Sequence, residues 1–339
     1  MKESNIVNKT GFLKKIFIKI CRLFGYEIID QSKYEIPTLN KSLSDSLSIP
    51  GKKSITVPQG EIKITRKISS LKIIFRSCTS ELIMDQNKKR LFNNDKNEYT
   101  FRSLKSILNS IDLAKESFNN INFQIIVTDT NSKNEDLDII KSILSKHKIS
   151  NKLIKINLNN YKDKITGNYT PAKFANMANL FTSLEMVKNE TSDLFYLVED
   201  DYIHTKDSIT EMLFTFEKFS TIFKEDVFLL PADYPYLYSK NENTKIFLGN
   251  QKHWRLVDES LVTFLASRKV IIKNFENLMQ MASKWGDPWE KPLHEIYKSV
   301  PCFSPIPSLS MHCANINSVY GLAPNVDWES IWNEKKKYK

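Results

Sequence analysis

Glycine and cysteine are scarce in this chain, and neither forms a motif. Only 8 of the 339 residues are glycine and 4 are cysteine. No two cysteines are spaced as C-x-x-C, and none stands at zinc-binding spacing from a histidine in the sequence. The common zinc modules and a disulfide framework are therefore excluded, and unpaired thiols favour a reducing compartment. We expect a cytoplasmic protein.

Long apolar segments are missing as well. No run approaches the ~20 apolar residues that cross a bilayer, and the polar first residues lack the pattern of a signal peptide. The net charge is +10, but the lysines that carry it are scattered, without the basic and aromatic stripe of a nucleic-acid groove. We therefore expect no nucleic-acid partner, although a basic surface attracts phosphorylated ligands and anionic membranes.

The chain does have the composition of a globular protein, with 41% hydrophobic and 26% charged residues, which predicts a sizeable core. Residues 1–69 differ from the rest. Within them, residues 11–26 (GFLKKIFIKICRLFGY) place apolar side chains at helical spacing with basic ones between them, which predicts a short amphipathic helix. Such a helix either lies on a membrane surface or packs on the protein's own domain or a partner. Residues 42–67 indicate a linker or extended arm.

From residue 70 to residue 334 strands and helices are expected to alternate, and residues 335–339 form a charged tail. Apolar runs predict strands over 71–75, 123–127, 153–158, 194–198 and 262–266. Amphipathic spacing predicts helices over 101–113, 137–147, 171–187, 275–284 and 287–299. The proline-rich stretch 301–307 is expected to be irregular. This pattern predicts an α/β fold with a doubly wound, mainly parallel sheet flanked by helices, whose ligands bind at the carboxyl ends of the strands.

Three consecutive acids, Glu199, Asp200 and Asp201, follow the predicted strand 194–198 directly. Adjacent carboxylates repel one another, so their grouping needs a counter-charge, and a divalent Mg²⁺ or Mn²⁺ ion is the simplest one. Because side chains alternate along an extended strand, Glu199 and Asp201 are expected to point together and Asp200 away. The alternative is a solvated acidic turn at the start of the next helix.

The order of polar strand ends continues along the chain as FRSCTS, IIVTDTNS, YLVEDDY, TFLASR, GDPWEKPL and SLSMHC. From about residue 71 to residue 332 this order resembles the GT-A type glycosyltransferases, most closely their family 2 group. The resemblance implies a Rossmann-like fold, a nucleotide-sugar donor, a divalent metal and inversion at the anomeric carbon. It also implies a nucleotide-sugar half over residues 70–202 and an acceptor half over residues 203–334.

The resemblance carries over to individual residues of the donor site. Asp129 matches the acid that hydrogen-bonds the nucleobase or its ribose, although a helix-capping Asp is the plainer alternative. The residues expected to contact the nucleotide sugar are Arg76, Ser77, Thr79, Asp129, Glu199 and Asp200.

The metal and base positions follow from the same resemblance. Asp201 and His312 match the residues that hold Mn²⁺ or Mg²⁺, although a histidine between small and apolar residues also fits a core position. Asp287 or Glu290 matches the carboxylate that accepts the proton of the acceptor hydroxyl. The sequence Asp-Pro-Trp-Glu departs from the usual arrangement here, so the choice between these two carboxylates stays open.

The function expected from these residues is the transfer of a sugar from a nucleotide-diphosphate donor to a glycan, lipid-linked or other hydroxyl acceptor. The resemblance suggests polysaccharide biosynthesis. If residues 11–26 lie on a membrane surface and not on protein, they would hold the protein at the inner face of that membrane. One alternative is a nucleotidyltransferase acting on sugar phosphates, which would need a glycine-rich phosphate loop that FRSCTS lacks. The other is an inactive glycan- or nucleotide-binding module.

Overall fold

The computed structural model describes residues 12–26, 63–80, 90–239, 244–314, 318–320 and 326–334. The chain divides into two compact units, Met1–Lys63 and Ile64–Lys339. In the first unit, helix α1 spans Phe12–Leu23, as the amphipathic pattern predicted. Among the helices that the structure describes, none is long and apolar enough to cross a membrane.

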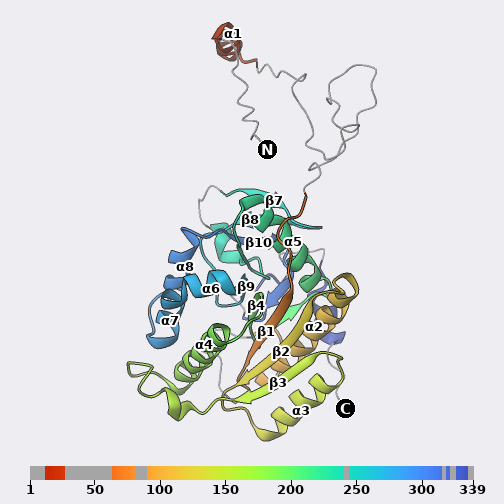
Figure 1. Cartoon of the computed structure of the whole chain (residues 1–339), viewed down its shortest axis with the longest axis vertical. Coiled ribbons are helices and arrows are strands. Elements are labelled where there is room, and N and C mark those ends of the chain that lie inside the picture. The colour runs from red at the N-terminus through yellow and green to blue at the C-terminus, as the bar shows by residue number, and fades with distance from the viewer. Residues whose placement is uncertain are drawn as a thin grey trace. The chain divides into compact units, whose positions relative to one another are not determined.

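A nine-stranded sheet forms the centre of the second unit, in the order β3-β2-β1-β4-β9-β6-β10-β8-β7 (Figure 1). Its first four strands are parallel to one another. Each has apolar residues in its middle, and in β1, β2 and β4 these residues are buried. They confirm the strands predicted from apolar runs, with bounds shifted by a few residues. These strands are β1 (Ser70–Ser77), β2 (Asn122–Asp129), β3 (Ser150–Lys155) and β4 (Leu194–Glu199).

The other half of the sheet mixes directions, since β9 is antiparallel to β4 and to β6 while β10 is parallel to β6 and antiparallel to β8. These strands are β6 (Phe228–Leu229), β7 (Ile246–Leu248), β8 (His253–Leu256), β9 (Phe264–Ser267) and β10 (Cys302–Ile306). The prediction of irregular structure over residues 301–307 was therefore wrong, because β10 lies there. The α/β class with a mainly parallel sheet is confirmed, since parallel pairing accounts for the longest ladders.

Two groups of helices cover opposite faces of the sheet (Figure 1). One group packs around α2 and the other around α4. The first is α2 (Lys96–Ser117), α3 (Asn134–Ser145) and α5 (Ser208–Phe223). The second is α4 (Pro171–Asn189), α6 (Arg268–Lys273), α7 (Phe275–Ser283) and α8 (Lys291–Tyr297). The helix predicted over 287–299 is thus shorter than expected, and the residues before Lys291 form a loop.

Two smaller features complete the second unit. Strands β5 (Tyr202–His204) and β11 (Ser310–His312) pair antiparallel outside the main sheet. Helix α9 (Trp328–Glu334) buries its two tryptophans with Tyr99 of α2 in a second apolar cluster. The main core contains side chains from both sides of the predicted division at residue 202, so the expected nucleotide-sugar and acceptor halves share one sheet and one core.

Local sequence explains where α4 begins. Pro171 occupies its first turn, where a missing N–H costs nothing, and the hydroxyl of Thr170 accepts a hydrogen bond from the Lys173 N–H (3.4 Å). This start places the first turns of α4 beside the carboxyl end of the sheet, where Lys173 and Asn176 line a cavity.

Candidate active site

A cavity of about 760 Å³ opens where the parallel strands end. The ends of β1, β2 and β4 are neighbours there, since Ser77 is paired with Asp129 and Arg76 with Glu199. The predicted residues that line the cavity are Arg76, Ser77, Glu199, Asp200, Asp201, Asp287, Glu290 and His312. These predicted residues therefore share one cavity at the carboxyl ends of the parallel strands, where ligands bind in sheets of this kind.

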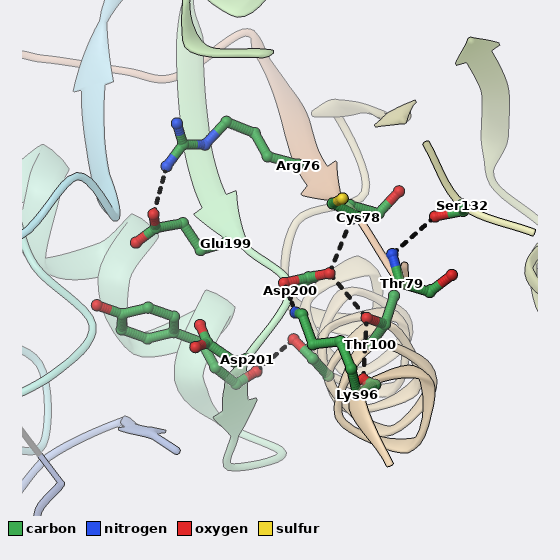
Figure 2. Close-up of polar contacts among 12 residues, drawn as sticks. Arg76, Cys78, Thr79, Lys96, Thr100, Ser132, Glu199, Asp200 and Asp201 are labelled. Carbon is green, nitrogen blue, oxygen red and sulfur yellow. Dashed lines mark hydrogen bonds and ion pairs between the residues drawn. The ribbon is translucent and has the colours of Figure 1, made fainter. Parts of the chain in front are cut away.

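Each carboxylate of the acidic run has its own basic partner, and Figure 2 shows the pairs made by Glu199 and Asp200. Glu199 Oε1 lies 2.7 Å from Arg76 Nη2, Asp200 pairs with Lys96, and Asp201 Oδ2 lies 3.3 Å from His312 Nε2. The partners come from β1, α2 and β11, which are far from the run in the sequence. The counter-charge that the sequence required is thus largely supplied by the protein itself.

Asp200 is held on all sides by protein groups. Its Oδ2 accepts hydrogen bonds from the Cys78 backbone N–H (3.0 Å) and from the Thr100 hydroxyl (2.7 Å), while Oδ1 receives the Lys96 ammonium. The side chain is buried. The expected contact between Asp200 and the nucleotide sugar would have to displace these bonds, so Asp200 is better placed to fix Lys96 than to meet a ligand.

Asp201 and His312 form a close acid–histidine pair. The imidazole stacks on the ring of Tyr202 (centroids 4.6 Å apart) and its Nδ1 is buried without a hydrogen-bond partner among the described residues. Burial opposes ionisation of Asp201, but the positive charges of His312, Lys96 and Arg90 outweigh it and hold the pKa of Asp201 below its ordinary value. Burial would lower the pKa of His312, yet Asp201 raises it overall.

A divalent ion fits this pair only as an ion shared with a ligand. Within the described ranges, no group of three or more His, Cys, Asp or Glu side chains is arranged to hold a metal. Asp201 and His312 would therefore be its two protein ligands, and the rest of its coordination would come from phosphate oxygens and water, an arrangement common for Mg²⁺ and Mn²⁺.

The loop before α8 brings two further carboxylates to the cavity. Burial raises the pKa of Glu290 to about 7, and the negative charge of Glu199 adds to that rise. Asp287 lines the same cavity but is exposed. A carboxylate with a pKa near neutrality accepts a proton more effectively than an ordinary exposed one, so Glu290 is the better placed of the two candidate bases.

Two residues that were expected to contact the nucleotide, Asp129 and Thr79, form hydrogen bonds with other side chains of the protein. Asp129 is buried and accepts hydrogen bonds from the Ser77 hydroxyl (2.9 Å) and from Ser132, and burial raises its pKa. The Thr79 hydroxyl donates to Asp136 Oδ2 (2.7 Å). Neither Asp129 nor Thr79 is among the residues that line the cavity. Both stabilise the turns that follow β1 and β2.

The cavity also contains residues that were not among the predicted site residues. Lys96 stands at the start of α2, five residues before the helix predicted there. Trp285 and Trp289 stack in parallel with centroids 5.0 Å apart, and Lys173 Nζ lies 4.4 Å from the Trp285 ring centre. The signal for these residues was weak, since a lone lysine or tryptophan in a sequence fits a surface or a core equally well.

No family model matches the chain, and no curated protein matches its sequence. Several solved structures do match. A UDP-glucose pyrophosphorylase complexed with UDP-glucose is 8% identical with a TM-score of 0.39, over 78% of this chain and 97% of that one. TarS of S. aureus is 14% identical with a TM-score of 0.35, over 63% of this chain and 32% of that one.

A further match is the galactosyltransferase LgtC in complex with donor and acceptor sugar analogues. It is 9% identical with a TM-score of 0.30, over 66% of each chain. The match to TarS spans about a third of the TarS chain. Since these identities are low, any function of the present chain depends on its own residues.

Proposed function

We propose that the chain is a glycosyltransferase that moves a sugar from a nucleotide-diphosphate donor to a hydroxyl group of a glycan or lipid-linked acceptor. The observation that supports this most directly is that one cavity holds both the Asp201–His312 pair and Glu290, whose pKa is raised to about 7. An acid–histidine pair suits a phosphate-bound cation, and a carboxylate of that pKa suits a general base. Residues suited to binding the leaving diphosphate and a residue suited to accepting the acceptor's proton thus line the same cavity.

In the proposed reaction, Glu290 accepts the proton of the acceptor hydroxyl while the hydroxyl oxygen attacks the anomeric carbon. The bond from that carbon to the diphosphate oxygen breaks, and its electron pair leaves with the diphosphate. A single displacement of this kind inverts the anomeric centre. Positive charge spreads over the sugar in the transition state, as in glycoside hydrolysis.

Asp201 and His312 would hold a Mn²⁺ or Mg²⁺ ion, which supplies positive charge to the leaving diphosphate when it is bound. The protein's own contribution is to orient these two side chains. The imidazole is fixed by its stacking on Tyr202, and the Asp201 backbone carbonyl accepts the Cys313 N–H (2.9 Å), which ties β11 to the acidic run.

The test is a panel of nucleotide sugars screened for released nucleoside diphosphate, with and without Mn²⁺, using wild type and Asp201→Ala. Slow hydrolysis of one donor that needs the metal and is lost in Asp201→Ala is the expected result. A matched control is Asp138→Ala, because Asp138 is an exposed acid outside the cavity. Release of pyrophosphate from a nucleoside triphosphate and a sugar phosphate would instead identify a nucleotidyltransferase. If no nucleotide binds with or without the metal, the donor-site assignment fails and a glycan-binding module becomes the better interpretation.

For α1 we propose contact with an anionic membrane surface on the cytoplasmic side. Within its own unit the helix leaves large apolar side chains uncovered, including Phe12 (77% exposed), Phe17 (57%) and Leu23 (85%). Lys15 and Lys19 are exposed on the same helix. A short helix with apolar and basic residues arranged in this way suits the boundary between headgroups and acyl chains.

A further inference from the structure

Lys96 is a basic residue of the cavity that pairs with the middle carboxylate of the acidic run. It is the first residue of α2, its side chain is 16% exposed, and it lines the cavity. Its ammonium group is paired with Asp200 Oδ1. An ammonium has three N–H donors, so the bond to Asp200 leaves two for another partner.

The surroundings of Asp200 fix that ammonium in place (Figure 2). The Thr100 hydroxyl, one helical turn after Lys96, donates to Asp200 Oδ2 (2.7 Å), and the Cys78 N–H donates to the same oxygen (3.0 Å). Asp200 is thereby connected to both β1 and α2. A charge held in advance in this way costs no reorganisation when a ligand of opposite charge arrives.

Arg76 provides a second and independent sign of an anionic ligand in the same cavity. Its side chain is buried, with the whole residue 4% exposed, and one nitrogen pairs with Glu199. Its Nε and Nη1 are buried and have no hydrogen-bond acceptor in the part of the chain that the structure describes. Buried donors without a partner are costly, so a ligand rich in acceptor oxygens would stabilise this side of the cavity.

We propose that Lys96 is a catalytic residue that binds the diphosphate of the donor through a fixed positive charge, with Asp200 as the residue that positions it. When the bond between sugar and diphosphate breaks, the electron pair stays on the diphosphate oxygen, and the Lys96 ammonium stabilises that charge without transferring a proton. This inference rests on the proposed function, since it takes the leaving group to be a diphosphate.

The experiment uses inorganic pyrophosphate as the probe, because it carries the diphosphate unit and needs no knowledge of the nucleobase. Binding to the full chain is measured by calorimetry in the presence of a chelator that removes divalent ions. Lys96→Met is expected to weaken binding by about tenfold or more, while Lys96→Arg keeps most of the affinity. Asp200→Asn is expected to weaken binding less than Lys96→Met does, because the positioning of the ammonium is lost while its charge remains.

Two further variants control for folding and for net charge. The double variant Lys96→Met with Asp200→Asn leaves no unpaired charge and should bind as weakly as Lys96→Met. Lys72→Met removes an equal charge from a buried lysine of β1 that pairs with Glu190 (2.5 Å) outside the cavity, and should bind as wild type does.

Equal binding by Lys96→Met and wild type, or no binding by wild type, would overturn the proposal. So would weaker binding by Asp200→Asn than by Lys96→Met, because a residue that acts only by positioning Lys96 cannot matter more than Lys96 itself. These outcomes are separate from the donor panel. If no nucleotide sugar is used but pyrophosphate binding still depends on Lys96, the proposed function fails and the Lys96 site remains.

Discussion

Glu290 is the residue whose protonation should control the rate. Burial raises its pKa to about 7, and the charge of Glu199 adds to this. A general base acts only when deprotonated, so we expect kcat/KM to decrease as the pH falls below about 7 and to level off above it. A pH–rate profile of the wild type with its donor and acceptor measures this directly.

The same residue can be tested by substitution. Glu290→Gln keeps the size of the side chain and removes its basicity, so kcat should fall about 10²- to 10⁴-fold. Affinity for the nucleoside diphosphate should stay as in wild type. The matched variant is Asp287→Asn, the exposed carboxylate of the same loop, which should retain the pH profile. If Asp287→Asn loses activity and Glu290→Gln does not, the base is Asp287.

Single residues could be predicted where a motif marks them, and not where their role depends on a distant partner. Asp201, His312 and Glu290 were predicted from strand ends and motif order, and the structure brings them to one cavity. Lys96 could not be, because no motif marks it and its pairing with Asp200, 104 positions away, is visible only in the fold. For Asp129 the motif was present but the expected contact is not supported. Asp129 ends β2, and its oxygens accept hydrogen bonds from Ser77 and Ser132 inside the protein.

At the scale of elements, strands with unbroken apolar runs were predicted and the proline-containing strand was not. β1 and β4 are covered by helices on both faces, so nearly all their residues are buried and their middle residues are mostly apolar. β10 contains Pro305, which argues against a strand. The strand forms because its neighbour β6 pairs only with Cys302 and Phe303, so the missing N–H of Pro305 leaves no gap in that ladder.

Helix α1 carries a prediction of its own. The full chain should co-sediment with vesicles that contain phosphatidylglycerol, less with phosphatidylcholine alone, and less at high salt, because basic residues contribute to binding. Phe17→Glu replaces an exposed apolar side chain of the helix (57% exposed). Burying such a side chain contributes ~1.5–3 kcal/mol, so vesicle binding should weaken about tenfold or more.

The control for α1 is Ile246→Glu, which places the same charge on an exposed apolar residue of β7 (59% exposed). It should leave vesicle binding unchanged. A lower melting temperature in Phe17→Glu, with vesicle binding as in wild type, would mean that the helix packs on protein and not on lipid.

At the scale of the whole molecule, the site depends on segments that only the complete sheet brings together. The proposed metal ligands Asp201 and His312 join the end of β4 to β11, and the proposed base, Glu290, comes from the loop before α8. The net charge of +10 is spread over the chain, but inside the cavity the acidic run is paired residue by residue. Folding thus prepares a site that is nearly neutral before any ligand is present.

This balance predicts how the stability of the folded protein responds to ligands. Because Asp201 already faces His312, Mn²⁺ alone has little net charge to neutralise and should scarcely change the melting temperature. A nucleoside diphosphate brings the negative charge that the ion needs, so the two together should raise the melting temperature by about 5 °C at concentrations near 100 Kd. Thermal melts with Mn²⁺, nucleoside diphosphate or both provide the comparison. A shift with Mn²⁺ alone as large as that with both ligands would mean that the protein holds the ion without the nucleotide.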